Sequence, residues 1–188
     1  GRRAMEAEEY PQALDAFGRA LDVKPLIRFY VAKASASTAL GQSGEAEELL
    51  RTALVAGAGG KMEQARARFA LARLLHSQGQ SERAIRTALG AVETARDPAT
   101  HLAGNPGHME YAHYLFHAPA FPQALLPQVT IITVTDEVAG WILELGSWYE
   151  EVGNVDEAAR LYRDLLEAVP DADEARARLE AMGLAGPD

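Results

Sequence analysis

One alanine recurs along this chain at intervals of 33, 38, 40 and 34 residues. A small residue stands twelve positions before each of these alanines. The alanines and their small partners are Ala13 with Gly1, Ala46 with Ala34, Ala84 with Ala72, Ala124 with Ala112, and Ala158 with Gly146. Two helices that pack closely need small residues where they touch. A period near 35 residues with such contacts is typical of repeated helix pairs, so the sequence predicts an array of them.

Further residues follow the same period. The pentapeptide YPQAL at 10–14 returns as FPQAL at 121–125, with the proline in the first turn of an expected helix. Four residues after the recurring alanine stand the aromatic Phe17 and Tyr162, and twelve after it stand Pro25 and Pro170. The second and third copies keep the spacing and the small residues but lack the aromatic residue, and the fourth copy, with Gln128 at that position, is degenerate.

On these residues the sequence resembles the tetratricopeptide repeat (TPR) family. The last copy carries the family pattern most fully, through Leu145, Gly146, Tyr149, Gly153, Ala158, Tyr162, Leu165 and Pro170. The resemblance implies an all-α fold, a right-handed superhelical array of antiparallel helix pairs. We expect a single domain over 1–188, with units near 1–25, 26–58, 61–97, 106–135 and 136–170 and a capping helix at 171–183.

Hydrophobic periodicity and turn residues predict where the helices lie. The expected helices cover 1–8, 10–23, 26–40, 43–56, 61–78, 81–95, 107–117, 136–151, 155–168 and 173–182, with a turn at 57–60 and a loop at 96–107. Thr133 or Thr135 is expected to cap the helix that starts at 136, and Asp171 or Asp173 the last one. For 120–134, a kinked helix, irregular backbone and a strand all stay open, because Pro127 and a β-branched run conflict with the repeat.

Composition excludes several classes of function. The chain has no cysteine, which excludes disulfides, thiolate zinc sites and a cysteine nucleophile. Its net charge of −9 disfavours binding to nucleic acid or anionic membranes. It has no apolar run of about 20 residues, so no membrane span is expected. We expect a cytoplasmic protein whose chain begins inside a repeat, which leaves a signal further upstream open.

The sequence shows no nucleophile elbow, P-loop or dinucleotide motif, so we expect no enzyme activity, no catalytic residue and no cofactor. Glu110, His113 and His117 share one expected helix face, and two imidazoles with a carboxylate are possible metal ligands. The zinc protease motif is incomplete, because Tyr114 follows His113. A metal- or histidine-dependent ligand-binding or hydrolytic site around 101–117 is therefore an alternative, and no metal ligand is assigned.

In the TPR family the first helix of each pair lines the concave surface. Carried over to this sequence, the lining includes Arg2, Ser35 and Ser147, and it is more basic than the whole chain. We therefore predict a protein–protein interaction scaffold that binds an acidic or amphipathic peptide, and no nucleic acid, in this groove. The candidate partner-binding residues are Arg28, Arg66, Phe69, Arg73, His76, Met109, His113, Phe116 and His117.

Two further predictions concern packing and assembly. Trp141 and Trp148 lie seven residues apart on one expected helix face, and we assign them to the core rather than to a ligand. The irregular segment 127–135 is a candidate contact for a homo-oligomer.

Overall fold

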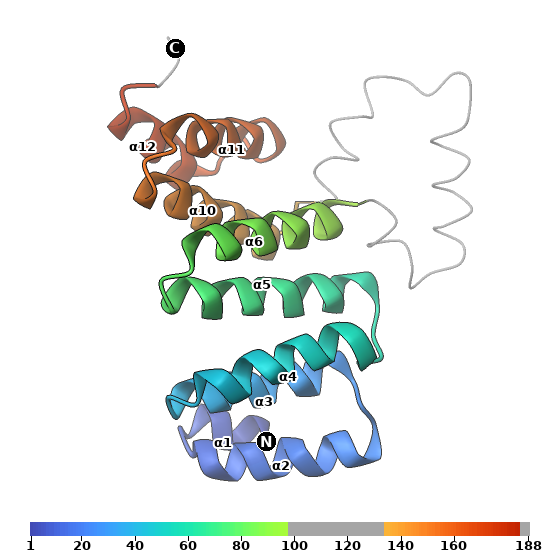
Figure 1. Ribbon diagram of the computed structural model, residues 1–188. Coiled ribbons are helices and arrows are strands. Elements are labelled where there is room, and N and C mark those ends of the chain that lie inside the picture. The colour runs from blue at the N-terminus through green and yellow to red at the C-terminus, as the bar shows by residue number, and fades with distance from the viewer. Residues whose placement is uncertain (98–133, 185–188) are drawn as a thin grey trace, which may run out of the picture. The chain divides into compact units, whose positions relative to one another are not determined.

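The computed structural model describes residues 1–97 and 134–184, and every regular element in these two ranges is a helix (Figure 1). The helices are α1 (Arg2–Glu6), α2 (Tyr10–Val23), α3 (Ile27–Ala39), α4 (Ser43–Ala56), α5 (Lys61–Ser77), α6 (Ser81–Arg96), α10 (Asp136–Glu151), α11 (Val155–Ala168) and α12 (Asp173–Ala181). They fall into two compact units, 1–91 and 92–188, whose boundary lies within α6. The helices at 43–56, 136–151 and 155–168 begin and end where the sequence predicts. The prediction of a single domain stays a prediction.

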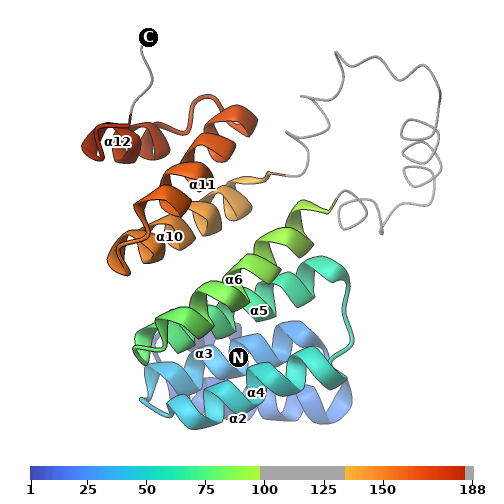
Figure 2. The same cartoon turned by 45° about the horizontal axis from the view of Figure 1, so that its top comes forward.

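Within the first unit, each helix from α1 to α4 packs on the next one along the chain, and α3 also contacts α5 directly. We call α1, α3, α5 and α10 the first helices of their pairs. In the view of Figure 1, α1 and α3 lie behind α2 and α4. In the second unit, α10 packs on α11 and α11 on α12, as Figure 2 shows from above. The all-α arrangement of helix pairs is therefore confirmed.

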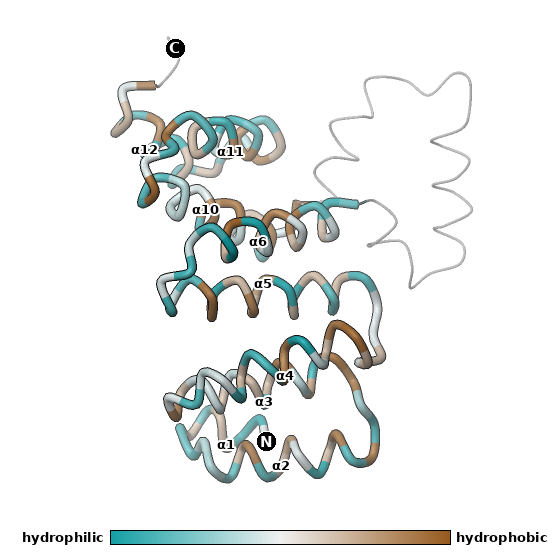
Figure 3. Tube along the Cα trace, viewed as in Figure 1, coloured by the Kyte–Doolittle hydropathy of each residue, from teal (hydrophilic) through white to brown (hydrophobic). Residues whose placement is uncertain are grey.

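The recurring small residues that the structure describes are buried, except for Gly1, which is exposed. Ala13, Ala46, Ala84 and Ala158 are completely buried, and Ala34 and Ala72 are at most 2% exposed. Figure 3 shows hydrophobic and hydrophilic residues alternating along the helices, as amphipathic helices require. Trp141 and Trp148 are 5% and 4% exposed, which confirms their assignment to the core. Ala112 and Ala124 lie outside the described residues.

A glycine and an aromatic ring form a matched pair in the first and last repeats. A Cβ placed on Gly146 would lie 2.5 Å from Cζ of Tyr162, and one on Gly1 would lie 2.8 Å from Cζ of Phe17. In the second repeat the same two positions hold a larger first residue and a smaller second one, Ala34 and Leu50. In the first and last repeats, the small residue and the aromatic residue sixteen positions after it therefore form one packing contact.

The turn inside each described pair uses a left-handed backbone position seven residues after the small residue. Gly41, Gly79 and Gly153 occupy it, with φ of 74°, 74° and 76°. Glycine is favoured there because a Cβ strains that conformation. In the first pair Glu8 occupies the same position with φ of 57°.

Helix capping follows the prediction at one end and departs from it at another. Thr135 caps α10, since its hydroxyl accepts a hydrogen bond from the Val138 amide at 3.4 Å. The prediction of an aspartate cap for α12 is wrong: Ala172 is the N-cap, with no side-chain bond. Asp173 is the first helical residue, and its carboxylate accepts a hydrogen bond from Arg176 at 2.5 Å. The side chain is thus engaged by an arginine one turn later.

Among the described helices, none is both long enough and apolar enough to cross a membrane. The residues of the predicted helix 107–117 and of 120–133 lie outside the described residues, and so does nearly all of the fourth unit.

Candidate partner-binding face

Charge in the first unit is divided between the two layers of helices. The first helices α1, α3 and α5 contain eight basic and two acidic residues, whereas α2, α4 and the part of α6 in this unit contain four basic and six acidic residues. The chain as a whole has a net charge of −9. The first helices of this unit therefore form a basic layer in an acidic protein.

Four exposed arginines of this layer occupy repeating positions. Arg28 of α3 and Arg66 of α5 are 38 residues apart, which is the spacing between the buried residues Ala34 and Ala72. Equivalent positions on helices in contact lie side by side, and α3 contacts α5. Arg28 and Arg66 therefore form one row.

A second row begins one residue after the recurring small residue. It consists of Arg2, Ser35 and Arg73, one from each first helix of the unit, and all three are exposed. We call Arg2, Arg28, Arg66 and Arg73 the basic face.

Two guanidinium groups of this face lie over aromatic rings. Cζ of Arg28 is 5.2 Å from the centroid of the Phe29 ring, and Cζ of Arg73 is 5.1 Å from that of Phe69. Cation–π attraction at these distances favours one position of a flexible side chain. The cost of ordering these arginines when they bind a partner is therefore reduced.

Phe69 itself is not part of an accessible surface, contrary to the sequence-based prediction. It is 1% exposed and ranks among the largest fully buried side chains. The helix turns by about 100° per residue, so position 69 lies about 60° around the axis from 66 and about 40° from 73. That rotation places the ring in the core and leaves both arginines in solvent.

The remaining candidates divide between the two parts of the chain. His76 is half-buried on α5, at the position that Thr38 holds on α3. Met109, His113, Phe116 and His117 lie outside the described residues, so their role in binding stays a prediction. The described residues contain no group of histidines and carboxylates able to hold a metal ion. The alternative site around 101–117 also lies outside them.

The first helix of the last repeat has the opposite charge. Helix α10 contains five acidic residues and no basic one. Its positions equivalent to Arg66 and Arg73 are Gly140 and Ser147. Among the first helices that the structure describes, the basic face therefore belongs to those of the first unit.

One of these acids is engaged within the second unit. Glu150 accepts a hydrogen bond of 2.5 Å from the Tyr162 hydroxyl and lies 3.5 Å from Arg178. Burial, followed by the bond to Glu150, raises the pKa of Tyr162 above its ordinary value. The hydroxyl thus stays protonated and keeps donating to Glu150 at neutral pH.

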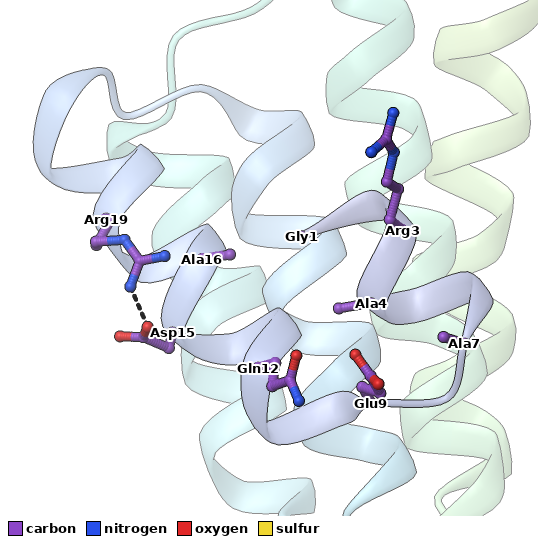
Figure 4. A pocket seen from close by; sticks show the side chains of 9 residues that line it. All are labelled: Gly1, Arg3, Ala4, Ala7, Glu9, Gln12, Asp15, Ala16 and Arg19. Carbon is purple, nitrogen blue, oxygen red and sulfur yellow. Dashed lines mark hydrogen bonds and ion pairs between the residues drawn. The ribbon is translucent and has the colours of Figure 1, made fainter.

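A cleft of about 550 Å³ lies between α1 and α2 (Figure 4). Its charged lining residues are Arg3, Glu9, Asp15 and Arg19, so basic and acidic groups are equal in number. Arg19 forms an ion pair with Asp15 across one turn of α2. The cleft therefore does not favour a ligand of either charge, in contrast with the basic face.

Comparison with protein families agrees with the repeat pattern. Models described as tetratricopeptide repeat match residues 1–61, 31–99 and 142–176. The chain belongs to the tetratricopeptide repeat family. TPR residues thus include all of α1 to α6, most of α10 and all of α11, and the resemblance seen in the sequence is confirmed.

Solved structures are similar to this TPR protein in fold. The crystal structure of MamA is 15% identical, with a TM-score of 0.59, over 97% of this chain and 84% of that chain. The C-terminal part of a TPR repeat-containing protein from Cytophaga hutchinsonii is 17% identical, with a TM-score of 0.41, over 98% of this chain and 73% of that one. No curated protein matches the sequence. At these identities the likeness to MamA concerns the fold alone.

Proposed function

We propose that this TPR protein is a non-enzymatic interaction module whose basic face binds an acidic segment of a partner protein. TPR repeats support a role in protein–protein interaction. The observation that carries the proposal is the excess of basic over acidic residues on the first helices of one unit, where four exposed arginines occupy repeating positions. Arginine binds carboxylates through two parallel hydrogen bonds, and it is enriched among the residues that dominate binding energy at interfaces.

The overall charge favours a short acidic segment over a long polyanion. Electrostatic fields are screened within about 8 Å at physiological ionic strength. A short segment on the basic face is therefore attracted by the nearby arginines. Nucleic acid extends well beyond this face and is repelled by the rest of a chain with a net charge of −9.

The exposed surface of the first helices also favours an acidic over an amphipathic partner. Among the described residues, the exposed large hydrophobic side chains are Val23, Leu40, Val55, Val152 and Val155. None of them lies within α1, α3 or α5. An amphipathic helix binds through apolar anchors that enter an apolar groove, and this face exposes no such anchoring surface.

Charge reversal on α5 tests the proposal. We expect the double variant Arg66→Glu, Arg73→Glu to bind a fluorescein-labelled peptide of alternating glutamate and serine roughly tenfold to a hundredfold more weakly than the native protein. The cause is the replacement of attraction by repulsion at two exposed positions. Fluorescence anisotropy at low and physiological salt measures the affinity, which is expected to fall with salt for the native protein.

The matched control is Arg19→Glu, Arg51→Glu, which reverses two exposed charges on α2 and α4 of the same unit. Each of these arginines pairs with an acid one turn before it, Asp15 and Glu47. Circular dichroism first establishes that both double variants are folded at the assay temperature. Equal weakening by both, or weakening by the control alone, would show that the basic face is not the binding site.

A further inference from the structure

From the two rows of the basic face we infer how the partner binds, on the basis of the proposed function. The partner segment is an extended peptide that crosses the first helices, and its acidic residues are three positions apart. Arg28 and Arg66 lie on α3 and α5, which are in contact, and Arg2, Ser35 and Arg73 hold equivalent positions on α1, α3 and α5. A ligand that meets successive arginines of one row therefore runs across the helices rather than along them.

The distance between neighbouring positions of a row matches the length of three residues in an extended peptide. Packed helices lie about 8–10 Å apart, so neighbouring positions of one row are separated by about that distance. A polyproline II segment rises about 3.1 Å per residue and has three residues per turn. Every third side chain then lies on one side, about 9 Å from the previous one. Acidic residues at that period meet successive arginines without a change of backbone direction.

A helical ligand is a poorer match for the same rows. An α-helix rises 1.5 Å per residue, so it needs about six residues to advance the same distance and about seven to bring a side chain back to the same face. Its binding would also depend on apolar anchors, and no large exposed hydrophobic residue lies within the described first helices. The arginine rows therefore favour an extended ligand.

Ser35 is the gap in the longer row. It is exposed on α3, and its hydroxyl donates to the Val31 carbonyl of its own helix at 3.0 Å. Its counterparts in the neighbouring repeats are Arg2 and Arg73. An arginine at position 35 would place cations at three successive steps of the row.

The first experiment compares three fluorescein-labelled peptides with equal numbers of glutamates. One repeats Glu-Ser-Pro, the second has the same composition with its glutamates in one block, and the third is an alanine-rich helix with glutamates seven apart. We expect the Glu-Ser-Pro repeat to bind roughly threefold to tenfold more tightly than the other two. Equal affinity for the first two overturns the spacing, and tighter binding of the helix overturns the extended conformation. Tighter binding of a single-stranded oligonucleotide overturns a peptide as the ligand.

The second experiment adds an arginine. Ser35→Arg is expected to raise the affinity for the Glu-Ser-Pro repeat roughly threefold to tenfold and to make binding more sensitive to salt. The control is Ser147→Arg, which adds the same charge at the equivalent position of α10, where the serine also donates to its own helix at 2.7 Å. Both variants are checked for folding by thermal melts.

The outcomes distinguish a failure of the arginine row as a recognition element from a failure of the proposed function. If Ser35→Arg and Ser147→Arg raise affinity equally, the row is not a recognition element, even where charge reversal at Arg66 and Arg73 weakens binding. If no acidic peptide binds the native protein, the proposed function itself fails. A gain for Ser35→Arg alone, with preference for the three-residue spacing, supports both.

Discussion

Replacing Phe69 with alanine is expected to lower the free energy of unfolding by about 3–5 kcal/mol, the range for truncating a large aromatic residue in a packed core. The ring is 1% exposed on α5, so truncation leaves a cavity that its neighbours fill only in part. Urea unfolding followed by circular dichroism measures the change. If Phe69 were instead a surface contact for the partner, the variant would keep its stability and lose binding.

Val23→Ala is the control for this substitution. Val23 is in the same unit and is 87% exposed, so its truncation is expected to change stability by less than about 0.5 kcal/mol. The contrast separates burial from loss of an apolar side chain as such. A Phe69→Ala effect no larger than that of Val23→Ala would contradict the placement of Phe69 in the core.

Gly146→Leu is expected to destabilise the second unit by about 1–3 kcal/mol or more. The new side chain would occupy the space of the Tyr162 ring, because even a Cβ on Gly146 would lie 2.5 Å from Cζ. Displacing the ring also breaks its hydrogen bond to Glu150. Both tryptophans of the chain lie in α10, so tryptophan fluorescence during urea unfolding reports on this unit.

Two further variants make the Gly146 result specific. Gly140→Ala changes a glycine of the same helix that has no atom within 4 Å of the added Cβ, and it is expected to stabilise by about 0.5–1 kcal/mol. Gly146→Ala with Tyr162→Leu reproduces the residues Ala34 and Leu50 of the second repeat. We expect this double variant to lose less stability than the sum of its single changes. Additive losses would mean that the two positions do not form one contact.

The repeat pattern predicts the fold of the described residues because its spacing locates two features at once. The small residues show where neighbouring helices are in contact, and the residues between them show where each helix ends and a turn begins. The left-handed turn at Gly41, Gly79 and Gly153 follows the same period. In the first repeat Glu8 occupies this position instead of glycine. Its left-handed backbone could therefore not be predicted from the recurrence of glycine.

The candidate site could be predicted only in part. The basic character of the first helices could be predicted, because it follows from counting the charged residues of each expected helix. That count needs no knowledge of how the helices pack. Whether one side chain is exposed depends on rotations of about 40–60° around a helix, which the spacing of Arg66, Phe69 and Arg73 does not resolve. The prediction for the cap of α12 is likewise wrong: Asp173 is the first helical residue, one position after the cap, and its carboxylate accepts a hydrogen bond from Arg176.

The most direct test of the basic face is a titration followed through the side-chain Nε–H signals of arginine in the NMR spectrum. Each arginine is assigned by its substitution with lysine, and unlabelled Glu-Ser-Pro peptide is added to isotope-labelled protein. We predict that the signals of Arg28, Arg66 and Arg73 shift in a saturable manner with one common affinity, while those of Arg19 and Arg51 on α2 and α4 stay in place. Saturable shifts confined to Arg19 and Arg51 would contradict the account, and so would equal shifts of all five.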